Sequence, residues 1–178
     1  MARIRRGNRR AAALFVLALA IALAAIAAQT AAARPAAVPC TAGHLSGKVR
    51  ESSGAAGTIA LSIAVRNLGP QACTLSGFPR LKLLSAGGGP LPTHVVHGGL
   101  ASLQRPVTTI TLAPGARASL LVAYSDVPTA SETTCEHSAR LSIILRHFRG
   151  HFSVPFDAHA CSHGRLFESP FVAGLVNV

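Results

Sequence analysis

The sequence contains no tryptophan, one tyrosine and one methionine, and aromatic residues make up only 4% of its 178 positions. A folded core made from this chain has to be filled mainly by Leu, Ile, Val and Phe. A core with so few aromatic side chains is small, so cross-links between cysteines become valuable for its stability.

Acidic residues are also few, and they do not form the patterns that acid–base catalysis requires. The only candidates are Glu51, Asp126, Glu132, Glu136, Asp157 and Glu168, and no two of them have the spacing of a catalytic pair. The strings Gly-x-Ser-x-Gly and Ser-x-x-Lys are absent, and Gly87-Gly88-Gly89-Pro90 is typical of a hairpin turn rather than a phosphate-binding loop. We therefore expect a protein that is not an enzyme and that uses no cofactor.

The N-terminus has the pattern of a secretory signal peptide. Five arginines and no acid lie between Arg3 and Arg10, and every side chain from Ala11 to Ala28 is apolar. We interpret residues 1–33 as a helical signal peptide that is cleaved after Ala33, and small residues also permit cleavage after Ala27. The alternative is an uncleaved membrane anchor, because 18 apolar residues just reach the length of a spanning helix.

The sequence around the first cysteine argues against a lipoprotein. Cys40 follows Val38 and Pro39, whereas lipidation needs a small residue other than proline before the cysteine. Three alanines follow Arg9 and Arg10, unlike the pattern of twin-arginine export signals. We expect ordinary export to a secreted or extracytoplasmic location, with residues 34–39 as a linker and residues 40–178 as one domain.

Removal of the signal changes how the basic charge is interpreted. The signal takes five of the 17 Lys and Arg residues and none of the six acids, so the mature chain carries a net charge of +6. The remaining basic residues are spread singly, without the runs or interleaved aromatics of a nucleic-acid surface. We expect no nucleic-acid partner, and contact with the membrane only through the signal segment. An anionic cell-envelope polymer or a protein is a possible partner.

Beyond the linker, apolar and polar residues alternate with a period of two, as in half-buried strands. Turn residues such as Asn67-Leu68-Gly69-Pro70 and Ala113-Pro114-Gly115 separate the alternating segments. The alternation predicts strands over residues 45–51, 58–66, 80–84, 107–112, 116–124, 139–147, 152–156 and 171–176.

Seven to nine short strands without a long helical pattern predict an all-β domain. We expect an immunoglobulin-like antiparallel β-sandwich in which residues 85–106 and 125–138 form long loops. Binding residues lie disproportionately on loops held by rigid sheets. The acidic loop from Asp126 to Glu136 and the segment from His94 to Arg105 are therefore candidate binding surfaces.

All four cysteines lie in the mature part of the chain, which is typical of a disulfide framework in an exported protein. Three pairings are possible, and the sequential one, Cys40 with Cys73 and Cys135 with Cys161, is favoured over the two others. Each of these disulfides closes a loop of about 30 residues, worth about 3.5 kcal/mol in the chain-entropy model.

Several short motifs together resemble the exported actinobacterial family known as domain of unknown function 4232. They are Gly54-Ala55-Ala56-Gly57-Thr58, Asn67, Cys73-Thr74-Leu75-Ser76-Gly77-Phe78-Pro79, Thr111-Leu112-Ala113-Pro114-Gly115, Tyr124-Ser125, Cys161 and Ser169-Pro170-Phe171-Val172-Ala173-Gly174. The resemblance covers about residues 40 to 176. It implies a secreted or surface-attached β-sandwich with sequentially paired cysteines, and it brings no catalytic residues. Many members are lipoproteins, from which this chain departs.

Histidines supply the alternative function. His94 and His97 offer two imidazoles, and His159 and His163 flank Cys161, so these four histidines are candidate ligands for copper or zinc. A cysteine held in a disulfide cannot be a thiolate ligand, and solvent-facing histidines need no metal. The sequence therefore favours a secreted or envelope-associated, non-catalytic binding module, with an extracytoplasmic copper- or zinc-binding protein as the alternative.

Overall fold

Strands form where apolar and polar side chains alternate along the chain. The computed structural model describes residues 38–129, 132–145 and 150–178, and the regular structure of this part is almost entirely β. The predicted signal peptide, with its cleavage site, and residues 34–37 of the predicted linker lie outside the described residues. Val38 and Pro39, at the end of that linker, form the first strand, β1.

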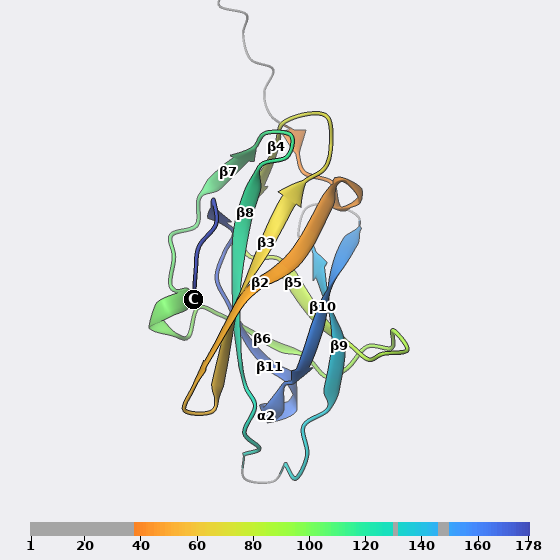
Figure 1. The fold of residues 1–178 in the computed structure, drawn as a ribbon, viewed down its shortest axis with the longest axis vertical. Helices are drawn as coiled ribbons and strands as arrows, with labels where there is room; N and C mark the ends of the chain where they lie inside the picture. The colour runs from red at the N-terminus through yellow and green to blue at the C-terminus, as the bar shows by residue number, and fades with distance from the viewer. Residues whose placement is uncertain (1–37, 130–131, 146–149) are drawn as a thin grey trace, which may run out of the picture. The chain divides into compact units, whose positions relative to one another are not determined.

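The twelve strands of the described residues form three sheets (Figure 1). The largest has the order β2 (Leu45–Ala55), β3 (Thr58–Asn67), β8 (Arg117–Ser125), β11 (Arg165–Glu168) and β6 (His94–His97), and β12 (Val172–Ala173) also pairs with β8. The second has the order β10 (His151–His159), β9 (His137–Ile144) and β5 (Arg80–Leu84). The third has the order β1 (Val38–Pro39), β4 (Cys73–Ser76) and β7 (Thr109–Leu112).

The main core lies between the first two sheets. In Figure 1, β2, β3 and β8 lie on one side of the domain, and β5, β9 and β10 lie on the other. Alternate residues of β3 and β8 point inward, and so do alternate residues of β10. The largest fully buried aliphatic side chains of this core are Ile63, Val65, Leu83, Leu112, Leu120, Leu141, Ile143 and Leu166. The core is thus filled by the side chains expected from a sequence poor in aromatics.

The single tyrosine packs at one end of this core. Tyr124 on β8 meets the ring of Phe156 on β10 edge to face, with ring centres 5.5 Å apart. Burial raises the pKa of Tyr124, and the nearby carboxylates of Asp126 and Asp157 raise the pKa further.

A buried asparagine joins the first sheet to the turns around it. The Asn67 side chain donates to the carbonyl oxygens of Gln71, at 2.8 Å, and Leu112, at 3.0 Å, and accepts from the N–H of Gly69 at 2.9 Å. Asn67 is 1% exposed, so these bonds satisfy polar groups that would otherwise be buried without partners. The turn predicted at this position is therefore held by the asparagine side chain itself.

The chain end covers part of the outer face of the largest sheet. Ser62 on β3 donates to the carbonyl of Val176, and Ser119 on β8 donates to the carbonyl of Gly174. A second, smaller apolar cluster lies under this segment and contains Leu103, Leu121 and Ala123. The largest sheet thus buries side chains on both faces along β8.

The prediction of a purely antiparallel arrangement is wrong. β11 pairs with β6 in parallel and β1 pairs with β4 in parallel, so two of the three sheets are mixed. The number of strands also exceeds the predicted seven to nine, because β1, β4, β6 and β11 were not predicted. These strands have two to four residues, and no longer alternating segment surrounds them in the sequence as it does at β7 and β12.

Two disulfides, Cys40–Cys73 and Cys135–Cys161, follow the sequential pairing. The first fastens the start of the domain to β4, and the second fastens the loop before β9 to the turn after β10. Disulfides of this kind indicate an oxidising, extracytoplasmic environment. Within the described residues, none of the helical segments has the length and apolar character needed to cross a membrane.

We predict that Gly47→Ala destabilises the domain. A Cβ at Gly47, on β2, would collide with Val154 Cγ1 and lie 2.9 Å from Phe152 Cε2 across the core. Overpacking of this kind costs about 1–3 kcal/mol. The measurement is the free energy of unfolding in urea. Gly43→Ala is the control, because nothing lies within 4 Å of its added Cβ. Equal stabilities of the two variants would contradict the close approach of β2 and β10.

Candidate functional site

A basic groove lies on the outer face of β2 and β3 and the start of β8. It is a hollow of about 570 Å³, lined by the cations Lys48, Arg50, Arg66 and Arg117 and by Ser46, Gly47, Val49, Ala64 and Leu175. Four of the 12 basic residues that follow position 33 therefore meet here, and none of the lining residues is acidic.

Strand register brings these cations together. Arg66 on β3 and Arg117 on β8 are direct partners across the antiparallel pair. The pairing of β2 with β3 shifts between Val49 and Glu51, which makes Arg50 the extra residue of a bulge beside Lys48. Bulges redirect side chains, and here both cations of β2 line the groove.

None of the described residues that line the groove is acidic. The ion pairs that His97, His137 and His163 form with acids involve none of the four cations. Arg66 donates from Nε to the carbonyl of Gly115 at 3.3 Å, which is a bond to a neutral group. Like charges directly opposite each other destabilise a sheet. The groove therefore concentrates positive charge at a cost to stability.

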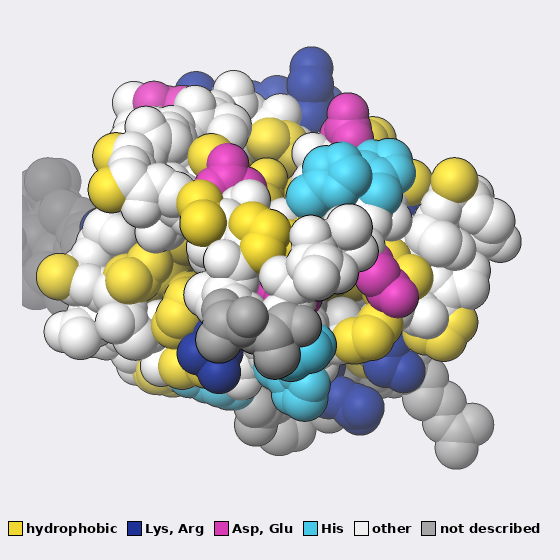
Figure 2. Space-filling model, turned by 90° about the horizontal axis from the view of Figure 1, so that it is seen from below, with side chains coloured by type: hydrophobic (Ala, Val, Ile, Leu, Met, Phe, Trp, Pro, Cys, Tyr) yellow, Lys and Arg dark blue, Asp and Glu magenta, His cyan; other side chains and the backbone are white. Residues whose placement is uncertain are grey.

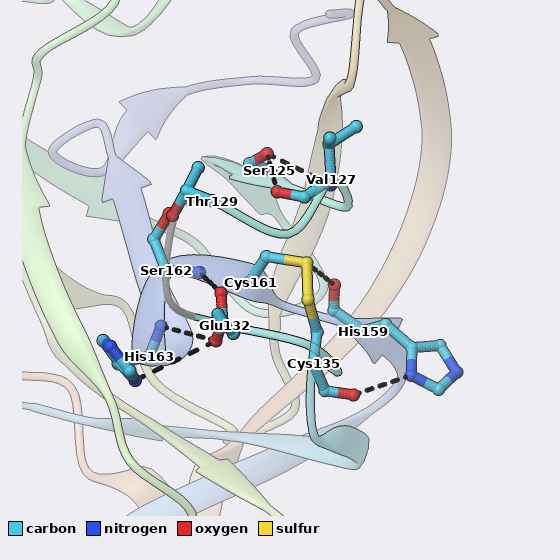
Figure 3. The surroundings of a disulfide bond; sticks show 9 residues. All are labelled: Ser125, Val127, Thr129, Glu132, Cys135, His159, Cys161, Ser162 and His163. Atoms are coloured by element: carbon cyan, nitrogen blue, oxygen red, sulfur yellow. Dashed lines mark hydrogen bonds and ion pairs between the residues drawn. A yellow bond between two sulfur atoms is a disulfide. The ribbon is translucent and has the colours of Figure 1, made fainter.

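A second distinctive feature surrounds the Cys135–Cys161 disulfide (Figure 3). After Cys161 the chain makes the short turn α2 (Cys161–Gly164), in which Ser162 and His163 have φ of 56° and 57°. Left-handed backbone costs about 1–2 kcal/mol for each residue with a side chain. The turn persists because Glu132 accepts hydrogen bonds from both of these backbone N–H groups, that of His163 at 3.0 Å.

The carboxylate of Glu132 supplies the negative charge beside the turn α2. Its side chain is 9% exposed, and the His163 imidazole Nδ1 lies 4.0 Å from Oε1. The backbone N–H of His163 lowers the pKa of Glu132 most, and the N–H of Ser162 and the nearby His163 ring also lower it, while burial opposes them. A hollow of about 310 Å³ beside it is lined by Glu132, Glu136 and His163 among others. Glu132 therefore holds the strained turn in its charged form.

The four histidines predicted as metal ligands lie at separate points. His94 and His97 are three residues apart on β6, so their side chains leave opposite faces of the strand. The His97 ring packs on Phe78, with ring centres 4.2 Å apart, and its Nε2 lies 3.8 Å from Oε1 of the buried Glu168. His163 is at the turn α2, and His159 ends β10.

In the described residues, the group of three or more metal-binding side chain types whose ligand atoms all lie within 4.8 Å is Glu132, Cys135 and Cys161. Both cysteines are in the disulfide, so neither offers a thiolate. The four predicted histidines do not belong to this group. Of the two candidate binding surfaces, the acidic loop contributes Glu132 and Glu136 to a pocket, and the segment from His94 to Arg105 contributes His97 to another.

The sequence reasoning missed the groove and one histidine. Alternation along β2 already placed Lys48 and Arg50 on one side of a predicted strand, which is half of the groove. The pairing of Arg66 with Arg117 depends on register across about 50 positions of sequence and left no local signal. His137 was missed because it precedes the predicted strand 139–147, whereas β9 begins at His137 itself.

We predict that Glu132→Gln removes an acid-dependent part of the stability. Because the folded pKa of Glu132 is lowered, its contribution is complete above the ordinary glutamate pKa of about 4.3 and is lost as the pH falls through the lower folded value. Urea unfolding between pH 3 and pH 7 should show a gap between wild type and variant that narrows in acid. Glu136→Gln is the control and should show no such gap. A gap that is independent of pH would contradict this role.

Comparison with known proteins places the chain in a family. A family model described as "Domain of unknown function (DUF4232)" matches residues 40–171, which include both disulfides, Glu132 and the four cations of the groove. No match was found among curated proteins or among solved structures. Because the family model covers most of the chain, the protein belongs to the DUF4232 family.

Proposed function

We propose that this protein is a secreted or envelope-associated binding module, without catalytic activity, that holds an anionic ligand in the basic groove. The observation that carries the proposal is the convergence of Lys48, Arg50, Arg66 and Arg117 around one hollow without an acidic neighbour among the lining residues. The pairing of Arg66 with Arg117 lowers the stability of the sheet, and a ligand that supplies negative charge would offset this repulsion.

The form of the groove favours an extended polymer over a small ion. Lys48 and Arg50 follow one another along β2, whereas Arg66 and Arg117 sit across β3 and β8, so the cations are spread over three strands. Arginine binds phosphate and carboxylate groups through paired N–H donors, and lysine acts as a compact charge. Gly47, Ala64 and Leu175 add small or apolar side chains to the lining. We propose an anionic cell-envelope polymer carrying phosphate or carboxylate groups as the ligand.

The lining of the groove supports binding rather than chemistry. Lysine and arginine are protonated at neutral pH and hold charge, while proton transfer would require a base such as a carboxylate or an imidazole. The lining residues offer neither. We therefore propose that the protein holds its ligand without altering it.

Export, the actinobacterial setting and the finer fold assignment belong to the same proposal. The arginine-rich and apolar N-terminus and the two disulfides support delivery to an oxidising compartment outside the cytoplasm. Two sheets that enclose one core support an immunoglobulin-like sandwich with additional short strands. The resemblance of its motifs to the exported actinobacterial family supports an actinobacterial envelope as its place of action.

We predict that the double variant Lys48→Gln/Arg50→Gln binds long-chain polyphosphate more weakly than the wild type. The loss of two cations should lower affinity at least tenfold at low salt and reduce the slope of log affinity against log salt by about 1–2. Isothermal titration calorimetry at several salt concentrations measures both quantities. Polyglutamate, as a second probe, distinguishes phosphate from carboxylate recognition.

The matched control for this experiment is Arg80→Gln/Lys82→Gln. It also removes one lysine and one arginine two residues apart on the exposed face of a strand, but on β5 in the other sheet. Affinity should stay near that of the wild type in this control. Equal losses in the two double variants would show that net charge alone attracts the polymer and would refute a groove-specific site. Failure of the wild type to bind either polyanion would also refute it.

Intact mass of the protein recovered outside an expressing cell tests export and cross-linking together. We predict the mass of a chain that begins at Arg34. Full reduction should raise this mass by about four hydrogen masses, because two disulfides open. A mass that retains residues 1–33 would instead support the uncleaved membrane anchor. Free thiols in the unreduced protein would contradict the disulfide arrangement.

A further inference from the structure

Two histidines meet on the outer face of the second sheet, away from the basic groove. His137 opens β9 and His159 ends β10, and they are direct partners in the antiparallel pairing of these strands. Their ring centres lie 4.9 Å apart, with the ring planes inclined by 34°. Figure 2 shows histidine side chains grouped on this end of the domain, one group beside an acidic side chain.

Each of the two rings has one nitrogen occupied by a hydrogen bond. His137 Nε2 lies 2.6 Å from Oδ1 of Asp157, and His159 Nδ1 lies 3.2 Å from the carbonyl oxygen of Cys135. A carbonyl and a carboxylate both accept, so a ring with a single N–H carries that hydrogen on the occupied nitrogen. The nitrogens left with a lone pair are Nδ1 of His137 and Nε2 of His159. Figure 3 shows the second nitrogen of His159 pointing away from the disulfide.

This pattern is the one found around metal-binding histidines. A histidine that binds a metal through one nitrogen almost always donates its other N–H to a carboxylate or a backbone carbonyl, which fixes the tautomer and orients the ring. Here both kinds of acceptor are present, one for each ring. The Cys135–Cys161 disulfide holds the carbonyl of Cys135 in place next to His159.

The separation of the rings also fits a shared ion. A metal about 2.0–2.1 Å from one nitrogen of each ring holds the ring centres about 4.5–5.2 Å apart, for angles between square-planar and tetrahedral. The ring centres of His137 and His159 are 4.9 Å apart. The His137 side chain is 48% exposed, so water can complete the coordination of an ion at this position.

We propose that His137 and His159 form a binding site for a divalent copper ion, with Asp157 as a positioning residue that acts through His137. Imidazole nitrogen suits copper and zinc, and among divalent first-row ions copper binds a given set of nitrogen ligands most tightly. Of these two residues, only His159 was among the four candidate ligands predicted from the sequence. The site stands independently of the basic groove, since β9 and β10 belong to the other sheet.

The test is titration of the purified, EDTA-treated protein with copper(II) chloride, followed by calorimetry and electron paramagnetic resonance. We expect one ion bound with micromolar affinity and hyperfine splitting from two nitrogens. His137→Gln and His159→Gln should each weaken binding at least tenfold and leave one nitrogen in the spectrum. His94→Gln removes one exposed imidazole from β6 and should bind copper as the wild type does.

Asp157→Ala separates positioning from folding. Loss of an acceptor behind a ligand typically costs 10–100-fold in metal affinity, so copper affinity should fall about tenfold while both nitrogens remain in the spectrum. The thermal unfolding midpoint without metal should stay at the wild-type value, because Asp157 is 93% exposed. Wild-type affinity in His137→Gln and His159→Gln, or loss of binding in His94→Gln, would overturn the site. Absence of binding below millimolar copper would overturn it as well.

Discussion

The pairing of β3 with β8 is the interaction on which the rest of the domain depends. These two strands match over nine consecutive positions at the centre of the largest sheet. Their inner side chains form much of the core against β10 and β9, and their outer serines hold the chain end. The same register that buries Ile63 beside Leu120 sets Arg66 opposite Arg117 at the end of the ladder. Core and groove are therefore two faces of one pairing.

The strands that could be predicted are those in which apolar and polar residues alternate over a long segment. β3 and β8 alternate over nine or ten positions, and burying one face is enough to specify such segments. β6 and β11 could not be predicted, because they are short segments whose strand structure depends on pairing with distant residues of the chain. Strand direction was missed for a related reason, since alternation looks the same in parallel and antiparallel neighbours. What local sequence lacks here is information about partners.

The candidate sites divide in the same way. Lys48 and Arg50 are close in sequence, so half of the basic groove could be predicted from β2 alone. The short spacing of His94 and His97 favoured a shared metal ion, but residues three apart on a strand point to opposite faces. His137 and His159 are separated by 22 positions of sequence, and only the register of β9 with β10 brings them together. Sites assembled across strands are visible only once the register is known.

The two disulfides have a consequence for how the chain acquires its cross-links. The loop closed by Cys40 and Cys73 ends long before the loop closed by Cys135 and Cys161 begins, so the loops neither overlap nor enclose one another. If the cysteines are oxidised in chain order, as the proposed export would present them, each meets its native partner first. A chain with this connectivity would then reach its final pairing without exchange between wrong disulfides.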